Sequence, residues 1–271
     1  MESYKLNLEN QHPNTIKIVD QFNVYRVPYK HVNNHPIYAF FVIPKVLPAG
    51  PRPLMEGGAQ AALTSVASTA GAIVLDAPNV IVVGESGGGY HTAQVALLGM
   101  TSLPIKCLII QYPALRLAEK MREEFERKEG SSRPFWPEKV PYSVVEEHLA
   151  GLEPGHVCAR APFATRMDLL AAMMQAGKFA DLEGDNAYLD PWVSLETAGK
   201  LPPILLYHSK EDEAVPWEHT DEWATKLKKL QPDVPLHLSF QTGPHVFDVD
   251  HTVDAPWLKE PLEFVSKYWP A

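Results

Sequence analysis

A serine stands between glycines at the point where an apolar strand gives way to a helix. The β-branched run Val80–Val83 leads into Gly84-Glu85-Ser86-Gly87-Gly88, and a small-residue segment of helical character follows directly. A G-x-S-x-G pattern between strand and helix is typical of a nucleophilic serine on a sharp, strained turn. Such a turn predicts small residues two positions before and two after the serine. The alternatives are a Gly-rich turn without chemistry and a phosphate-binding loop, the latter disfavoured because G-x-G-x-x-G and the Walker lysine are both absent.

A serine nucleophile needs a base, and the base needs an orienting acid. Asp212 lies just past the apolar run "PPILLYHS". A carboxylate beyond the carboxyl end of a parallel strand lies at the same edge of the sheet as Ser86. We therefore predict that Asp212 is the acid. Glu211 and Glu213 are competing acids, and an acidic surface loop is the alternative without chemistry.

The predicted base is His245, which lies two residues beyond Gly243 and after the last strand-like run. His251 is its main rival. We expect His208, at a strand end, to be structural, and His91 to pack on the helix that follows the serine turn. A solvated or buried histidine without a chemical role is the alternative for His245 as well.

The order of the three residues along the chain favours this set. Ser86, Asp212 and His245 follow one another as Ser…Asp…His, each after a separate predicted strand. That is the order found in one fold that carries a serine nucleophile. Three positions that agree make the set more specific than any single motif.

The segments that must position these residues read as alternating strands and helices. An antiparallel pair, "TIKIVDQFNVYRVPY" and "HPIYAFFVIP", is predicted to open a sheet. A helix over 56–71 follows, and further strands are predicted from the apolar runs "AIVL", "VIVV", "IKCLIIQYP", "PPILLYHS" and "PLHLSFQTG". Continuous apolar runs separated by helical segments indicate a mostly parallel sheet with helices on both faces.

The region 115–200 differs from the rest. It contains a mixed-charge helix, "LRLAEKMREEFERKEG", a loop rich in Pro and aromatic residues, and helical pieces such as "ATRMDLLAAMMQAGKF", with no convincing strand. We predict a helical lid or cap over 115–200, inserted into a core formed by 1–114 and 201–271. Phe135 and Trp136 of this insertion are predicted to line an apolar substrate pocket, whereas core packing is the expected role of Met173 and Met174.

Composition excludes several classes of protein. The chain has 271 residues, 45% of them hydrophobic, and a net charge of −9, which argues against nucleic-acid binding. Two cysteines, Cys107 and Cys158, are too few for a disulfide framework or a zinc site. No secretory signal and no apolar run of membrane-spanning length is visible. We expect a soluble, cytoplasmic protein without a membrane or nucleic-acid partner.

With these residues in place, the chain resembles an α/β-hydrolase, closest to the fungal members of the hydrolase-fold-3 (hormone-sensitive-lipase-like) group. The turn "VVGESGGGY" is similar to that group's Gly-Asp/Glu-Ser-Ala-Gly-Gly turn, and "HSKEDEAVP" and "GPHVF" resemble its acid and histidine loops. The resemblance implies Ser86 as nucleophile, His245 as general base and acid, Asp212 as its partner and the Gly87 N–H as an oxyanion donor. Relatives hydrolyse carboxylic esters or act in small-molecule biosynthesis, without metal or cofactor.

The sequence departs from that family before the serine. Relatives carry a His-Gly-Gly-Gly type loop that completes the oxyanion hole, and before Ser86 this sequence has paired glycines only at Gly57-Gly58. The stretch from Pro44 to Val80 has room for one βαβ unit of about 30 residues, not for two. "RPLM" resembles the beginning of the family's third strand, so we infer that a family segment is absent from this chain.

Three functions remain open at this point. The first is a serine esterase that acts through an acyl-enzyme on a small apolar ester, with Glu85 and Tyr90 also near the substrate. The second is a hydrolase-fold binding protein of little activity, favoured by the missing loop. The third is an acyltransferase or cyclase that uses the same three residues, which sequence does not separate from a hydrolase. Substrate identity and oligomeric state are likewise open.

Overall fold

The structure is a computed structural model, and it describes residues 2–6, 9, 16–17, 19–32, 34–45, 52–56, 75–116, 139–153, 165–178 and 186–269. The predicted helix over 56–71 lies outside these residues except for Glu56, which ends a strand. The predicted mixed-charge helix lies outside them from residue 117 onward, and the aromatic loop lies outside them up to residue 138.

The N-terminal hairpin forms a sheet of its own. Strands β2 (Phe22–Val32) and β3 (His35–Pro44) pair in antiparallel fashion, and the short β1 (Glu2–Ser3) adds to β2. The predicted pair is thus confirmed, but it does not open the main sheet, and it starts later than its apolar pattern indicates. The Asp20 N–H donates to the Ile16 carbonyl, so a helical turn precedes the strand.

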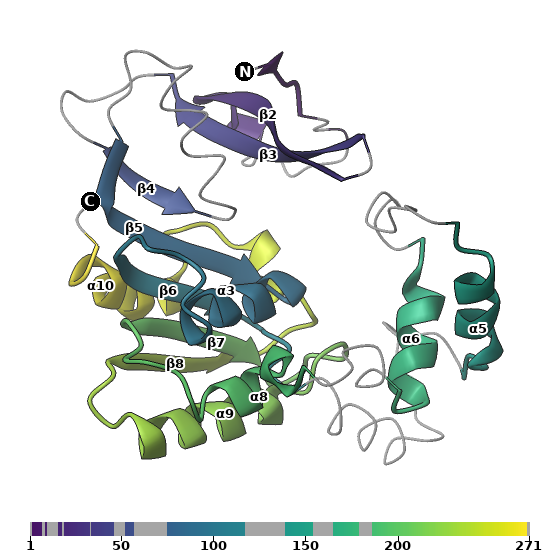
Figure 1. The fold of residues 1–271 in the computed structure, drawn as a ribbon. Helices are drawn as coiled ribbons and strands as arrows, with labels where there is room; N and C mark the ends of the chain where they lie inside the picture. The colour runs from purple at the N-terminus through teal and green to yellow at the C-terminus, as the bar shows by residue number, and fades with distance from the viewer. Residues whose placement is uncertain are drawn as a thin grey trace.

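The main sheet has five parallel strands in the order β4-β5-β6-β7-β8 (Figure 1). They are β4 (Arg52–Glu56), β5 (Leu75–Glu85), β6 (Ile105–Gln111), β7 (Ile204–Ser209) and β8 (Leu236–Gln241). The pairing of β4 directly with β5 confirms that "RPLM" begins a strand. The predicted run "VIVV" lies in β5, which begins at Leu75, the last residue of the predicted run "AIVL"; residues 72–74 of that run lie outside the described residues.

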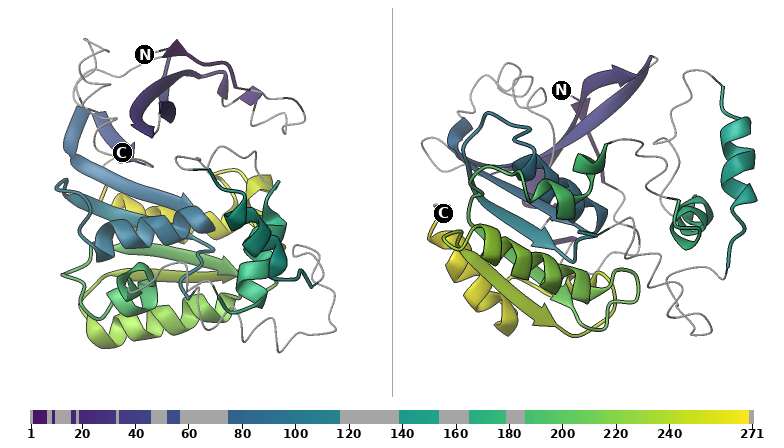
Figure 2. Two further views of the ribbon diagram at one scale, coloured as in Figure 1. Left: turned by 45° about the vertical axis from the view of Figure 1, so that its right-hand side comes forward. Right: turned by 60° about the horizontal axis from the view of Figure 1, so that its bottom comes forward.

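Helices cover both faces of this sheet, as predicted (Figure 2). On one face lie α3 (Gly87–Leu97), the short α8 (Pro191–Ser194) and α9 (Trp217–Leu230). On the other lies α10 (Lys259–Ser266). Alternate residues of the strands point to opposite faces, so two apolar clusters form.

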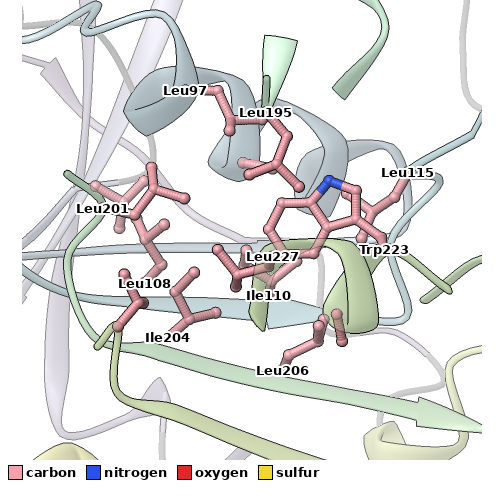
Figure 3. Close-up of a cluster of buried hydrophobic side chains, with 14 of the residues drawn as sticks. Leu97, Leu108, Ile110, Leu115, Leu195, Leu201, Ile204, Leu206, Trp223 and Leu227 are labelled. Carbon is pink, nitrogen blue, oxygen red and sulfur yellow. The ribbon is translucent and has the colours of Figure 1, made fainter. Parts of the chain in front are cut away.

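The larger cluster lies between the sheet and α3, α8 and α9. Figure 3 shows its members, among them Leu97, Leu108, Ile110, Leu195, Ile204, Leu206, Trp223 and Leu227. The smaller cluster on the opposite face contains Ile81, Cys107, Leu205, Tyr207, Phe247 and Val265. Burial on both faces explains why the central strands read as continuous apolar runs.

Two helices from the region 115–200 lie beyond the carboxyl ends of the parallel strands. These are α5 (Ser143–Ala150) and α6 (Met167–Gln175), and all three views place them on that side of the sheet (Figures 1 and 2). Buried Ala171 and Met174 of α6 pack with Tyr90 and Ala114 of the core. A lid over 115–200 remains a prediction, and its C-terminal part, around Leu195, packs into the larger core cluster.

Three short 3₁₀ helices complete the described elements: η2 (Ala187–Leu189), η3 (Phe247–Asp250) and η4 (Pro256–Leu258). None of the helices in the described part of the chain is long and apolar enough to cross a membrane.

Candidate active site

Ser86 occupies the strained turn between β5 and α3. Its backbone has φ 51° and ψ −118°, a conformation that an L-residue adopts only under constraint from its surroundings. The Ser86 N–H donates to the Gln111 carbonyl at 2.9 Å, which ties the turn to the end of β6. The Ser86 carbonyl accepts from the Tyr90 N–H at 3.2 Å and so begins the helix.

Steric crowding explains some of the glycines around Ser86 but not all of them. A Cβ added at Gly84 would collide with the Gly88 carbonyl and with Thr92 Oγ1, so the position two before the serine is restricted as predicted. A Cβ at Gly88 would meet nothing within 4 Å, so the prediction for the position two after the serine is wrong. The crowded position is instead Gly89, where a Cβ would lie 2.8 Å from Pro113 Cβ.

His245 connects Ser86 to Asp212. Its Nε2 lies 3.0 Å from Ser86 Oγ, and its Nδ1 lies 2.7 Å from Asp212 Oδ2. With the proton on Nδ1 donated to the carboxylate, Nε2 can accept the serine hydroxyl proton. The side chains of His245 and Asp212 are 5% and 0% exposed, so the pair is shielded from water. The rival base His251 is exposed, and its ring contacts those of Phe247 and Trp257.

Asp212 is held by hydrogen bonds to both carboxylate oxygens. Oδ1 accepts the backbone N–H groups of Ala214 and Val215, each at 2.8 Å. Oδ2 accepts from His245 and also lies 3.1 Å from Nε2 of His208. Burial alone would raise the pKa of Asp212, but hydrogen bonds from His208, His245 and Val215 together hold this pKa well below its usual range.

The two competing acids contact the histidine loop through its backbone and not through the imidazole. Glu211 accepts the Gly243 N–H at 2.7 Å, and Glu213 accepts the His245 N–H at 3.0 Å. Three consecutive carboxylates therefore hold one loop, and Asp212 in the middle is the one that reaches the ring.

A chain of polar side chains joins the serine turn to the histidine loop. The Tyr112 hydroxyl lies 2.8 Å from Glu85 Oε2 and 2.9 Å from Asp248 Oδ1, while Asp248 Oδ2 accepts the Tyr207 hydroxyl at 2.7 Å. Burial and the nearby carboxylates raise the pKa values of Tyr112 and Tyr207, which keeps both phenols protonated. The ring of Tyr112 also contacts that of His245 edge to face, with centroids 5.2 Å apart.

The predicted substrate-binding residues have different surroundings. Glu85 is exposed beside Ser86 and bonds Tyr112. Tyr90 is half-buried, and its hydroxyl donates to the Leu189 carbonyl at 2.7 Å, so that end of the side chain is occupied by the protein. Phe135 and Trp136 lie outside the described residues, as does the pair Gly57-Gly58.

Gly87 is exposed at the first turn of α3. The first N–H groups of a helix have no intrahelical acceptor, and the helix dipole places positive charge there. The predicted oxyanion donor is therefore at a position suited to an anion that develops next to Ser86.

His208 is the contact that sequence reasoning missed. The prediction of a structural histidine is consistent with its complete burial, but the ring also bonds the predicted acid. His208 lies near the end of β7, and Asp212 follows it by only four residues. This short spacing was the available sequence signal that the two side chains could meet. Within the described residues, no cluster of His, Cys, Asp or Glu could hold a metal ion.

The chain was compared with known families, with curated proteins and with solved structures. No family model matches the chain. The chain is 25% identical over 197 residues to the "Probable carboxylesterase M8" of Phoma sp., a match that covers 72% of this chain and 61% of that protein. The chain thus spans about three fifths of the length of this curated relative.

Solved structures with a similar trace include esterase B from Lactobacillus rhamnosus HN001, with 16% identity, a TM-score of 0.44, and coverage of 77% of this chain and 57% of that one. They also include a puromycin-hydrolysing peptidase of Mycobacterium tuberculosis, with 16% identity, a TM-score of 0.46, and coverage of 77% and 24%.

The topology of the chain itself defines its fold class. A parallel sheet carries a serine on a strained strand–turn–helix junction, and acid and histidine follow after two later strands in the order Ser, Asp, His. This combination characterises one doubly covered α/β architecture, so the core has the α/β-hydrolase fold.

Proposed function

We propose that this protein is a serine hydrolase of carboxylic esters that acts through an acyl-enzyme. The observation that carries the proposal is the continuous contact from Ser86 Oγ to His245 Nε2 at 3.0 Å and from His245 Nδ1 to Asp212 Oδ2 at 2.7 Å. The similarity to a probable carboxylesterase supports the ester as the substrate class.

Acylation begins when Ser86 Oγ attacks the ester carbonyl carbon and its proton passes to His245 Nε2. The new O–C bond forms as the carbonyl electron pair moves to oxygen. Asp212 stabilises the imidazolium that results, because its carboxylate is ionised and hydrogen-bonded to Nδ1. The intermediate then collapses, the bond to the alkoxy group breaks, and His245 returns the proton to the departing alcohol.

The negative oxygen of the intermediate is stabilised at the N-terminus of α3. The Gly87 N–H is the donor that the described residues offer for this role. A single donor gives less stabilisation than a pair, since the loss of one donor typically slows a reaction by about 10²–10³-fold. The proposal therefore includes a modest turnover rate unless residues 57–74 contribute a second N–H.

Deacylation repeats the same proton transfers with water as the nucleophile. His245 takes a proton from water as the water oxygen attacks the acyl carbon, and then gives a proton to Ser86 Oγ when the acyl–serine bond breaks. The acid product leaves and the free serine is restored.

The substrate class that we propose is a small apolar ester. The helices α5 and α6 lie on the side of the sheet where Ser86 is found, and apolar Ala171 and Met174 pack toward Tyr90. We infer that the segment 115–200 forms a lid whose apolar residues, Phe135 and Trp136 among them, cover the acyl group. A role in the biosynthesis of small molecules is part of the same proposal.

A fluorophosphonate probe tests the proposal directly, because it phosphonylates an activated serine. We expect labelling of Ser86 in the unaltered protein and none in Ser86→Ala, while His245→Ala loses labelling because the hydroxyl proton has no acceptor. Turnover of a p-nitrophenyl ester should fall by about 10⁴–10⁶-fold in both variants.

Ser266→Ala is the matched control, since Ser266 lies exposed on α10 and bonds the Glu263 carbonyl. It should label and turn over as the unaltered protein does. If folded, unaltered protein is not labelled, the hydrolase proposal is wrong and the protein is better explained as a hydrolase-fold binding protein.

A further inference from the structure

A second imidazole contacts the acid of the triad, and the proposed mechanism does not use it. His208 has 0% exposure, and its Nε2 lies 3.1 Å from Asp212 Oδ2, the oxygen that also bonds His245. We propose that His208 is a positioning residue in the sense that it acts through Asp212: it donates to Oδ2, the oxygen that also bonds His245, and so limits the negative charge that faces the base. This inference rests on the proposed function of the triad.

The contacts of His208 determine which ring nitrogen carries the proton. Nε2 faces two acceptors, Asp212 Oδ2 and the Val215 carbonyl, both at 3.1 Å. A lone pair on Nε2 would be repelled by both, so Nε2 is the donor. Nδ1 lies 2.7 Å from Thr220 Oγ1, and in the neutral ring it accepts the hydroxyl proton of Thr220.

The role of His208 is separable from the task of holding Asp212 in place. The backbone N–H groups of Ala214 and Val215 fix Oδ1, and these bonds are made within the acid loop itself. Removal of the His208 donor therefore leaves the carboxylate oriented and changes chiefly the charge on Oδ2. A donor bound to a carboxylate spreads its charge and weakens its hold on a second donor.

Other titratable groups that face the Asp212–His245 pair come from the acid loop and from the residue that follows β6. Glu213 accepts the backbone N–H of His245, and the ring edge of Tyr112 packs against the imidazole. The remaining neighbours, one residue or one contact further away, are Glu211, Asp248 and Glu85. In contrast to these groups, His208 bonds Asp212 Oδ2, the oxygen that also bonds His245.

The consequence is a defined shift in the pH dependence of the reaction. Without the His208 donor, Asp212 Oδ2 places more negative charge beside His245 and stabilises its protonated ring. The acid limb of the kcat/KM profile should therefore move to higher pH, on the order of 0.5 pH unit. A residue that only fills space would lower the amount of folded protein and leave this limb where it is.

Three variants test the idea. His208→Leu removes the donor at similar size and should give the full upward shift. His208→Gln places an amide N–H near the position of Nε2 and should return the limb toward its original place. Thr220→Val keeps the imidazole but removes the bond at Nδ1, which makes Nε2–H a weaker donor, so a smaller upward shift is expected.

His251→Gln is the matched control, because it removes an exposed histidine that lies on the same loop as His245 but bonds none of the triad. The acid limb of its kcat/KM profile should coincide with that of the unaltered protein. If Thr220→Val and the folded His208→Leu variant also coincide with it, or shift to lower pH, the inference is wrong. Thr220→Val alone decides the matter if His208→Leu does not fold.

A second readout is independent of turnover. The ring ¹⁵N resonances of His245 can be followed against pH in the labelled variants, and the titration midpoint should rise in the same order as the kinetic limb. If Ser86 fails to react with a fluorophosphonate, the proposed function fails while this titration still tests His208. If Ser86 reacts but the midpoints coincide, only the inference about His208 fails.

Discussion

Backbone strain in the described residues gathers at the proposed site. Four of the described residues other than glycine have positive φ, and three of them are Ser86 (51°), Tyr112 (35°) and Val246 (60°). This conformation is unfavourable for bulky and β-branched residues, at a cost of roughly 1–3 kcal/mol each. Each of the three lies in or next to a hydrogen bond or ring contact of the proposed triad, so the surrounding structure holds all three in a conformation that they disfavour.

At the scale of single residues, the low pKa of Asp212 predicts a pH-dependent stability. Because the pKa is lower in the folded chain than its unfolded value of about 3.9, the ionised carboxylate stabilises the fold fully above that value. This contribution is lost as pH falls from about 4 toward the folded pKa. Asp212→Asn should lower the free energy of unfolding by ~3 kcal/mol at pH 7, and this difference should shrink below pH 4.

Urea unfolding between pH 3 and pH 8 measures this difference. Asp221→Asn, which removes an exposed carboxylate on α9, serves as the control and should run parallel to the unaltered protein. A gap between Asp212→Asn and the unaltered protein that stays constant from pH 8 to pH 3 would contradict the assignment of a depressed pKa to Asp212.

At the scale of elements, the junction of β5 and α3 depends on two glycines. Gly84→Ala would place a methyl group against the Gly88 carbonyl, and Gly89→Ala would place one 2.8 Å from Pro113 Cβ and 3.0 Å from the Gln111 carbonyl. We expect Gly84→Ala to lower the free energy of unfolding by ~3 kcal/mol or more, because backbone must move, and Gly89→Ala by ~1–3 kcal/mol.

Gly88→Ala is the control for both, since its added methyl group enters open space within the first turn of a helix. Its free energy of unfolding should be unchanged or higher by up to ~1 kcal/mol, as helix propensity predicts. Thermal or urea unfolding of the three variants would separate these cases. Equal losses in all three would show that crowding is not the reason for the glycines.

The junction also shows how far sequence reasoning extends. The pattern around Ser86 predicts the strand, the turn and the helix because these are local features with strong sequence signals. Gly89 and Gly88 could not be distinguished in advance, since the neighbour of Gly89 is Pro113, which follows another strand. The same holds for His208 and Glu213, whose partners are set by how two loops meet in space.

At the scale of the whole molecule, the two sheets differ in how much they bury. All six residues of β7 are buried, and β6 and β7 each have a strand on both sides. In the described part of the N-terminal sheet, Val24 and Val27 are the buried apolar residues, while Phe40 and Val42 are more than half exposed. The central strands should therefore be the most stable part of the molecule.

Hydrogen–deuterium exchange with mass spectrometry tests this expectation. Amides of β6 and β7 should exchange slowest, those of β8 at the edge of the described sheet faster, and those of β3 faster again in a separate transition. Exchange of β3 at the rate of β7 would show instead that the two sheets unfold as one unit.

The sequence predicted the parallel strands from β5 to β8, because continuous apolar runs indicate them, and the order of Ser86, Asp212 and His245 along the chain remains the basis of a proposal about the site. It did not predict that the N-terminal hairpin forms a sheet of its own, since hydropathy indicates strands but not which strands pair. The lid over 115–200 and the absent family segment remain predictions, because Phe135, Trp136 and Gly57-Gly58 lie outside the described residues.

The three consecutive carboxylates have a consequence for the exchange of parts between related proteins. Glu211, Asp212 and Glu213 hold Gly243 and His245 by three separate bonds, although about 30 residues and one strand separate the two loops along the chain. A histidine loop moved alone into a related protein would therefore lose the three carboxylates that bind it. An acid loop moved alone would lose the backbone N–H groups and the imidazole that its carboxylates bind. Recombination and design should therefore move the two loops together, with one boundary before the acid loop, at or before β7, and the other after the histidine loop.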